Sequence, residues 1–325
     1  MTTTTMTTLQ RSAMPKVGRL LRDYGIVWVT LLLFVALAVT TPHFASLDNV
    51  RNILDQHAIV LVVASAATLQ LIAGGFDVSL SAIFILAPLI ALRVENETGS
   101  IATAVVVGLL AGLVAGILNG LVVSVLRINS FIATLASSFV FFGIAYLVSD
   151  KSILRPSDYG FREFATNRIL GLTSATWMAL AVVALLWFVL ERTRFGRYVF
   201  ATGGNPEAAR LAGLRTGLVV TATFALSGVA AGLAGTINAA QSLSAQASDD
   251  FSLVFAVIAA IVVGGTSIAG GEGAVWRTVV GVLFMALLTN GFNLNGVDPV
   301  VQRIVQGLVI IAAVAVDSWS RARRT

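Results

Sequence analysis

The stretch TGSIATAVVVGLLAGLVAGILNGLVVSVL, residues 98–126, contains no charged side chain. At roughly 1.5 Å of rise per residue, a helix of this length is longer than the hydrocarbon core of a bilayer, which is about 30 Å thick. Four of its five glycines recur at every fourth position and therefore share one helix face: Gly108, Gly112, Gly116 and Gly120. This spacing predicts a membrane-spanning helix that packs closely against a neighbouring helix.

The chain as a whole is strongly apolar. Of its 325 residues, 57% are hydrophobic and 11% are charged, and the mean hydropathy is +0.90. A soluble domain of this size needs more charge to cover its surface, so the composition indicates a membrane protein surrounded by lipid. Ten charge-free runs divide the sequence: 24–47, 56–76, 78–92, 98–126, 128–149, 169–190, 216–248, 251–271, 278–297 and 304–316.

Eight of these runs hold at least 20 residues, about the length that a helix needs to cross the hydrocarbon core. The runs 78–92 and 304–316 are shorter, and each can lengthen if a flanking charge faces protein or extends to the interface: Asp77 or Arg93 for the first run, and Arg303 for the second. We therefore expect ten membrane-spanning helices, with eight or nine as alternatives. The runs show no alternation of polar and apolar residues, which leaves an all-α polytopic fold.

The two ends of the chain differ from its apolar body. Residues 1–23 are polar and are expected to form a disordered cytoplasmic tail, 24–317 the transmembrane domain, and 318–325 a basic cytoplasmic tail. The chain has no cysteine and only two histidines, so we expect neither a disulfide nor a metal site. The sequence pI of about 10.2 is typical of arginine-rich loops in a membrane protein and does not indicate nucleic-acid binding.

The distribution of basic residues predicts the orientation. With ten spans, the loops on the side of both termini carry 14 of the 21 lysines and arginines. Because basic residues are enriched in cytoplasmic loops, both termini are expected inside the cell. The loop 150–168 then lies outside, and its mixture of charges and aromatic residues suits either a docking partner or a solvated connector.

A short helix is expected in the cytoplasmic loop between spans six and seven, within FATGGNPEAARLAGL at 200–214. Asn205 is a favourable N-cap, Pro206 suits the first helical position, and Glu207 complements the helix dipole. Gly213 ends the helix after about seven residues, a length that is unstable in water without support. The membrane surface or another protein is therefore expected to hold this helix.

The glycine pair before this helix, Gly203 and Gly204, is interpreted as a hinge that leads into it. A phosphate-binding loop of the ATPase type needs a lysine directly after its last glycine. Neither of the two lysines, Lys16 and Lys151, occupies such a position. We therefore expect no nucleotide site, no catalytic residue and no cofactor in this chain.

Neutral polar residues inside the expected spans are candidates for a translocation path: Gln70, Asn119, Ser137, Asn290 and Asn293. Ion-coupled transporters commonly carry ionisable groups in mid-membrane, whereas the acidic residues here stand at the ends of the spans. The path therefore suits an uncharged solute that forms hydrogen bonds. The alternative for each residue is a structural role in joining helices.

Two glycine-rich breaks interrupt the apolar runs, LIAGGFDVSLSA at 71–82 and VVGGTSIAGGEGAVW at 262–276. Each combines Gly-Gly with short hydroxyl residues, a pattern that suits a helix that stops and turns. Broken helices tend to line cavities, where the freed backbone groups find water or solute.

Five blocks in order resemble the ribose-type permease family of ABC importers: GGFDVS, RINSFIATLASSF, FGRYVFATGGNPEAARLAGL, VVGGTSIAGG and NGFNLNGVDPVVQRIVQGLVIIAAVAVD. The resemblance extends over about residues 50–317. It implies a permease subunit of the cell inner membrane that imports a monosaccharide by alternating access. It also implies three partners: a second permease subunit, a cytoplasmic ATPase with tandem nucleotide-binding domains, and an extracytoplasmic solute-binding protein.

The same resemblance implies that the short loop helix is the coupling helix that docks into the ATPase, formed by Gly203, Gly204, Asn205, Pro206, Glu207, Ala208, Arg210 and Gly213. The chain departs from the family pattern at 252–256, where SLVFA stands in place of an aromatic and acidic cluster of the type GYELD. Permeases for branched-chain amino acids or nucleosides are the alternative within this class. An ion-coupled secondary transporter is the alternative from a different class.

Overall fold

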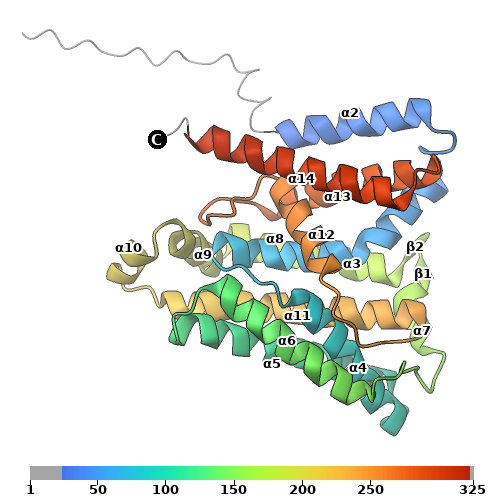
Figure 1. Cartoon of the computed structure of the whole chain (residues 1–325), viewed down its shortest axis with the longest axis horizontal. Coiled ribbons are helices and arrows are strands. Elements are labelled where there is room, and N and C mark those ends of the chain that lie inside the picture. Colours follow the sequence, from blue (N-terminus) through green and yellow to red (C-terminus); the bar gives the residue numbers. More distant parts are fainter. Residues whose placement is uncertain (1–23, 323–325) are drawn as a thin grey trace, which may run out of the picture.

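The computed structural model describes residues 24–322, so the expected tail 1–23 and residues 323–325 lie outside the described part. The elements are α2 (Gly25–Thr40), α3 (Leu47–Ile72), α4 (Leu80–Thr98), α5 (Ile101–Val125), α6 (Ser130–Ser149), α7 (Phe161–Thr166), β1 (Arg168–Ile169), β2 (Leu172–Thr173), α8 (Ser174–Arg192), α9 (Arg194–Gly204), α10 (Pro206–Leu211), α11 (Thr216–Ser242), α12 (Ser252–Val263), α13 (Val275–Leu294) and α14 (Pro299–Ala322). The described part of the chain is thus a helical bundle with one hairpin, whose two strands have two residues each (Figure 1). The predicted all-α polytopic class is confirmed.

Within residues 24–322, six helices are long and apolar enough to cross a membrane: α3, α5, α6, α8, α11 and α13. The other four charge-free runs contain α2, α4, α12 and α14. The run 251–271 is expected to form one helix that spans the membrane. In the structure, α12 has only 12 residues and ends where Gly264 and Gly265 begin an irregular segment. At roughly 1.5 Å per residue, α12 is about 18 Å long and does not cross a bilayer alone.

The two short runs lengthen as expected. Helix α4 continues past the charge-free run to Thr98, and Arg93 within it donates to the carbonyl of Val148 and pairs with Asp150. Helix α14 begins at Pro299, ahead of Arg303, and continues to Ala322, so residues 318–322 of the expected tail are helical.

Helices α5 and α11 pack closely through their glycines. A Cβ atom added to Gly112 would lie 2.2 Å from the carbonyl oxygen of Gly228, and one added to Gly228 would lie 2.2 Å from that of Gly112. A Cβ atom on Gly116 would lie 2.4 Å from the carbonyl oxygen of Phe224. Real Cβ atoms do not approach this closely, so the two backbones touch because neither carries a side chain there.

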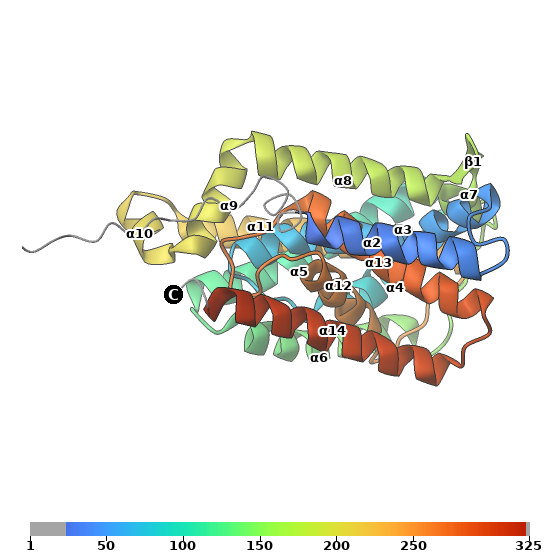
Figure 2. The ribbon, with the colours of Figure 1, turned by 90° about the horizontal axis from the view of Figure 1, so that it is seen from above.

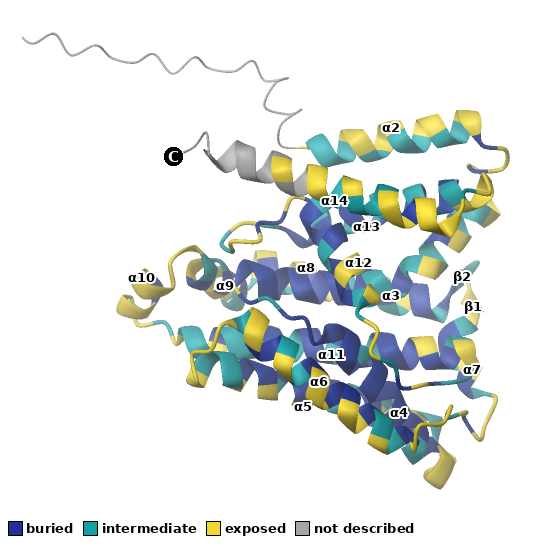
Figure 3. Ribbon diagram, in the orientation of Figure 1, coloured by how far each residue is buried: buried dark blue, intermediate teal, exposed yellow. Residues whose placement is uncertain are grey.

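Burial follows the position of each helix in the bundle. Helices α3, α4 and α11 contain more buried residues than any other helix of the described part, whereas α2 has none (Figure 3). Helix α2 packs on α13 through a separate small cluster around Phe44 and Leu287. Many large apolar side chains on the outside of the bundle are exposed, as a lipid-facing surface requires.

The bundle has two distinct ends (Figures 1 and 2). Helix α10 extends from one end, here named the α10 end, and helix α7 with the β1–β2 hairpin covers the other, the α7 end. At the α7 end, the buried Glu95 of α4 accepts hydrogen bonds from the backbone N–H groups of Ser157 and Asp158 and from the Ser157 hydroxyl. The loop 150–168 is therefore anchored to the bundle.

Candidate coupling and translocation sites

Helix α10 forms from the capping residues that the sequence predicts. The side chain of Asn205 accepts a hydrogen bond of 2.9 Å from the N–H of Ala208, and Pro206 occupies the first turn. Glu207 and Arg210 form an exposed ion pair at 3.2 Å. Gly213 has a φ of +86°, a conformation that glycine adopts without strain, and it directs the chain into α11.

The structure corrects the interpretation of Gly203 and Gly204. They do not form a hinge into α10; they are the last residues of α9, an 11-residue helix that sequence analysis did not separate from the loop. Helix α9 begins at the N-cap Thr193 and buries Gly196, Val199 and Thr202. The missed signal is this spacing of every third residue, which gives α9 one buried face.

Gly203 lies at a meeting point of three chain segments, here named the glycine junction (Gly74, Gly203, Gly270 and Gly271). A Cβ atom on Gly203 would lie 1.7 Å from the carbonyl oxygen of Ile72 and 2.8 Å from the N–H nitrogen of Gly271. That N–H donates to the Ile72 carbonyl at 2.8 Å. The end of α9 is thus in direct backbone contact with both glycine-rich breaks, one after α3 and one after α12.

A buried polar cluster brings together two of the five candidate path residues. The carboxyl of Asp77 accepts from the N–H of Ser79 at 2.8 Å, from the Ser79 hydroxyl at 2.5 Å, and from the Gln70 amide at 3.3 Å. Asn119 of α5 in turn donates to the Ser79 hydroxyl oxygen at 2.6 Å. The cluster joins α3, α5 and the start of α4 inside the core. Gln70 and Asn119 therefore have the alternative role, in which a polar side chain joins helices.

Sequence reasoning placed Asp77 at the end of a span and left it out of the candidate path, because its charge stands between two charge-free runs. Its segment is an extended connection between α3 and α4 that lies against α6, where the Ser130 and Thr134 hydroxyls accept from the N–H groups of Phe76 and Val78 at 3.0 Å each. These contacts satisfy backbone groups that a broken helix leaves free. The carboxyl is consequently buried, although it belongs to a connection between helices.

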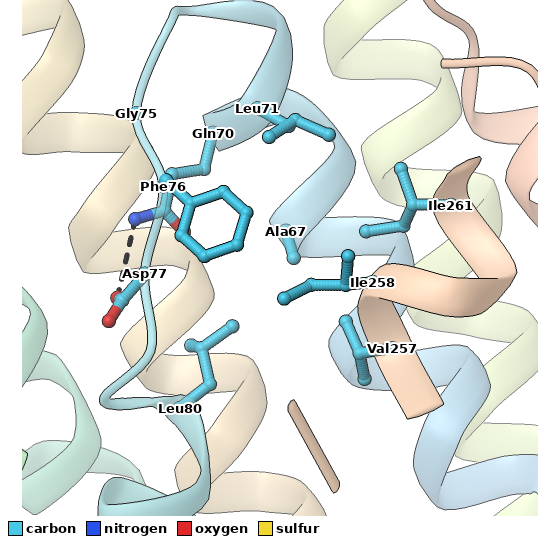
Figure 4. Close-up of a pocket in the computed structure, with 10 residues that line it drawn as sticks. All are labelled: Ala67, Gln70, Leu71, Gly75, Phe76, Asp77, Leu80, Val257, Ile258 and Ile261. Carbon is cyan, nitrogen blue, oxygen red and sulfur yellow. Dashed lines mark hydrogen bonds between the residues drawn. The ribbon is translucent and has the colours of Figure 1, made fainter. Parts of the chain in front are cut away.

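A small cavity borders this extended segment (Figure 4). The ring of Phe76 points toward Ala67 and Ile258, whereas the carboxyl of Asp77 points to the opposite side of the segment. The volume of this cavity, about 20 Å³, is enough for one water molecule and too small for a sugar. In this conformation, Gln70 and Asp77 therefore do not face an open path.

The other three candidate path residues lie apart from this cluster. Ser137 donates to the carbonyl of Thr134 within its own helix. Asn290 exchanges hydrogen bonds of 2.9 and 3.0 Å with Asn49, which joins α13 to α3. Asn293 is exposed and accepts from Gln302 at 3.0 Å. The five residues thus do not line one common cavity.

Removing the carboxyl of Asp77 is expected to destabilise the bundle. The Asp77→Ala substitution leaves the Ser79 and Gln70 donors without an acceptor in the core, at about 1–3 kcal/mol for each unsatisfied group. Asp250 is a matched control, because it accepts from the N–H and hydroxyl of Ser252 in the same pattern but is exposed. Thermal unfolding in detergent should show a large decrease for Asp77→Ala and little change for Asp250→Ala; equal decreases would contradict this role.

A second cavity, of about 430 Å³, lies between α3, α12, α13 and α14 and is here named the α12–α14 cavity. Its size is within the range of roughly 300–1,000 Å³ that is typical of small-molecule sites. Ser252, Phe255 and Ala256, from the segment where the sequence departs from the family pattern, line it. Sequence reasoning did not place this site, since none of the five candidate path residues lines it.

The fold and these sites define a multi-pass helical membrane protein with two broken helices and a short exposed helix, α10. The family described as "Branched-chain amino acid transport system / permease component" matches residues 49–314. The chain belongs to this family of transport permeases. No solved structure matches it.

Three relatives from Escherichia coli (strain K12) cover nearly the whole chain. The ribose import permease protein is 34% identical over 298 residues, which are 89% of this chain and 92% of the relative. The L-arabinose transport system permease protein is 35% identical over 312 residues, 95% and 94% of the two chains. The galactose/methyl galactoside import permease protein is 35% identical over 323 residues, 94% and 96%. The resemblance to ribose-type permeases is confirmed.

Proposed function

We propose that this protein is the permease subunit of an importer that moves a monosaccharide into the cytoplasm at the expense of ATP hydrolysed by a separate ATPase chain. The similarity to ribose, arabinose and galactose permeases over about nine-tenths of the chain carries this proposal. These relatives favour a sugar over the branched-chain amino acids in the family's description, and over nucleosides. The subunit itself binds and releases solute and makes or breaks no covalent bond.

The proposal includes a topology in the cell inner membrane. Residues 24–317 form the permease domain, the ten charge-free runs form ten membrane segments, and both termini are cytoplasmic. The excess of arginine on the α10 side supports this orientation. The α10 end then faces the ATPase, which carries tandem nucleotide-binding domains, and the α7 end faces the solute-binding protein.

Helix α10 is proposed as the coupling helix. It has six residues, and all but Ala209 are exposed, including Leu211 at 80%. An isolated helix this short is unstable in water, so contact with a partner would support it. Its attachment through α9 to the glycine junction provides a route by which movement of the ATPase reaches both broken helices.

The anchored loop at the α7 end suits a docking partner. Tyr159 and Leu170 are 71% and 85% exposed there. Contacts of the bundle with Ser157 and Asp158 of the loop, and with Thr173 of β2, fix the position of this surface. A second permease copy completes the translocation path between the two subunits.

Replacement of Glu207 and Arg210 by alanine is expected to abolish transport and ATPase association but to leave membrane insertion intact. The pair is exposed, and such pairs contribute at most about 1 kcal/mol to stability, so the bundle itself should still fold. The measurements are copurification of the ATPase and sugar uptake into cells, with and without ATP depletion and an uncoupler.

The swapped variant Glu207→Arg/Arg210→Glu is the control for helix stability, since it keeps an ion pair with the same spacing. Loss of ATPase association in both variants supports a docking surface. Normal uptake by the alanine variant would refute the coupling role. Uptake that survives ATP depletion and stops with an uncoupler would refute ATP-driven import and favour an ion-coupled transporter.

A further inference from the structure

We propose that the α12–α14 cavity is the site where the permease receives the monosaccharide, and this inference rests on the proposed import function. The cavity lies between the segments that meet at the α7 end. The connection before α12 pairs with the loop 150–168 through mutual hydrogen bonds of 2.9 Å between Leu154 and Ala245. The turn between α13 and α14 is tied by Asn295 to Thr41, at the end of α2. The α14 residues that line the cavity, Arg303 to Ile310, belong to the half of α14 that begins at this turn, so the cavity is nearer to the α7 end than to α10.

Two helices, α12 and α14, each line the cavity with residues of a single helix face. Helix α12 contributes Ser252, Phe255, Ala256, Ala259 and Ala260, and α14 contributes Arg303, Gln306, Gly307 and Ile310. Both sets follow the spacing i, i+3, i+4, i+7 that places residues on a single helix face, and Ala260 extends the first set to i+8. The opposite side of α12 is closed, because Val254 and Val257 are fully buried while Phe255 is 63% exposed.

The polar groups of the cavity suit hydroxyl groups of a neutral solute. His57 Nδ1 lies 3.1 Å from the carbonyl oxygen of Ile53, which can only accept, so Nδ1 carries the proton and Nε2 of the neutral ring is an acceptor. Gln306 donates to the Thr289 hydroxyl at 3.2 Å, and its amide carbonyl forms no hydrogen bond with the described residues. Arg303 adds donors, and it forms no ion pair with any side chain that the structure describes.

The lining of the cavity favours a sugar over a solute that carries an ammonium group. A sugar has hydroxyl groups that donate and accept, and an apolar face of C–H groups that can lie on the Phe255 ring. A zwitterionic amino acid needs a carboxylate near its ammonium group, and none of the described residues that line the cavity supplies one. The lining thus favours a polyhydroxylated ring over an amino acid, and Arg303 can donate to the hydroxyl groups of such a ring.

The test uses the natural absence of cysteine in the chain. Single cysteines are introduced as Ala256→Cys and Gly307→Cys on the two facing helices, with Leu308→Cys as the control. Gly307 has open space around its Cα atom, so the new side chain fits, and Leu308 is exposed on α14 without lining the cavity. Each variant is reconstituted with its ATPase in proteoliposomes that contain ATP.

A membrane-impermeant methanethiosulfonate is added outside and washed away before the binding protein and labelled D-ribose, L-arabinose or D-galactose are supplied. We expect loss of most of the uptake by Ala256→Cys and Gly307→Cys, recovery after reduction of the mixed disulfide, and no loss by Leu308→Cys. If the unmodified protein imports a sugar but the cavity variants keep full uptake after the reagent, the proposed sugar site is refuted and the proposed import function is not. Unmodified protein that imports none of the sugars would overturn the proposed function and the site together.

Discussion

Replacement of Gly203 by alanine is expected to reduce sugar uptake by at least about tenfold, the equivalent of about 1.4 kcal/mol, whereas Gly204→Ala should leave it unchanged. The new Cβ atom on Gly203 would lie 1.7 Å from the Ile72 carbonyl oxygen, which accepts the hydrogen bond from Gly271. Both partners are backbone atoms and cannot rotate away. The three segments of the glycine junction must therefore separate.

Gly204 is a close control because it is the next residue of the same helix. A Cβ atom there meets nothing within 4 Å. In a helix interior, alanine is favoured over glycine by up to about 1 kcal/mol, so Gly204→Ala should not weaken α9. The comparison thus separates the effect of the junction from the effect of helix propensity.

The measurements are uptake, thermal unfolding in detergent, and ATPase activity of the assembled complex with and without sugar-loaded binding protein. If the junction transmits movement, Gly203→Ala keeps its ATPase partner and basal hydrolysis but loses the stimulation by binding protein. Uptake by Gly203→Ala that matches Gly204→Ala would contradict the role of the junction.

The sequence predicts those parts of the fold that depend on local rules. The absence of charge defines the membrane segments, because lipid tolerates few charges along a helix. The capping residues Asn205 and Pro206 predict α10, since each satisfies a backbone requirement within one turn. Both Gly-Gly breaks are likewise visible, and α3 and α12 end there at Ile72 and Val263.

The remaining features depend on contacts between segments far apart in the sequence. Asp77 stands at the end of an apolar run, and only the fold shows that Gln70 and Ser79 surround it in the core. In the sequence Gly203 resembles a hinge, because the residues that it contacts, Ile72 and Gly271, are distant in the chain and the sequence does not show these contacts. The α12–α14 cavity is composed of four helices with few polar residues each, so no local pattern indicates it.

The largest effect on folding is expected from the contact between α5 and α11. In Gly112→Ala, the added methyl group would lie 2.2 Å from the Gly228 carbonyl oxygen and 3.1 Å from the Cα atom of Gly232. No smaller residue exists at those positions, so a compensating substitution cannot restore the space. Overpacking of this kind costs typically about 1–3 kcal/mol, and occasionally more where backbone has to move.

Gly143→Ala on α6 is the matched control, because its Cβ atom meets nothing within 4 Å. Both positions are interior to long apolar helices, so both substitutions gain the same helix propensity, up to about 1 kcal/mol. Thermal unfolding in detergent should therefore show a lower midpoint for Gly112→Ala and an equal or higher midpoint for Gly143→Ala. A higher midpoint for both would mean that α5 and α11 separate without cost, and it would refute close glycine packing as the basis of the core.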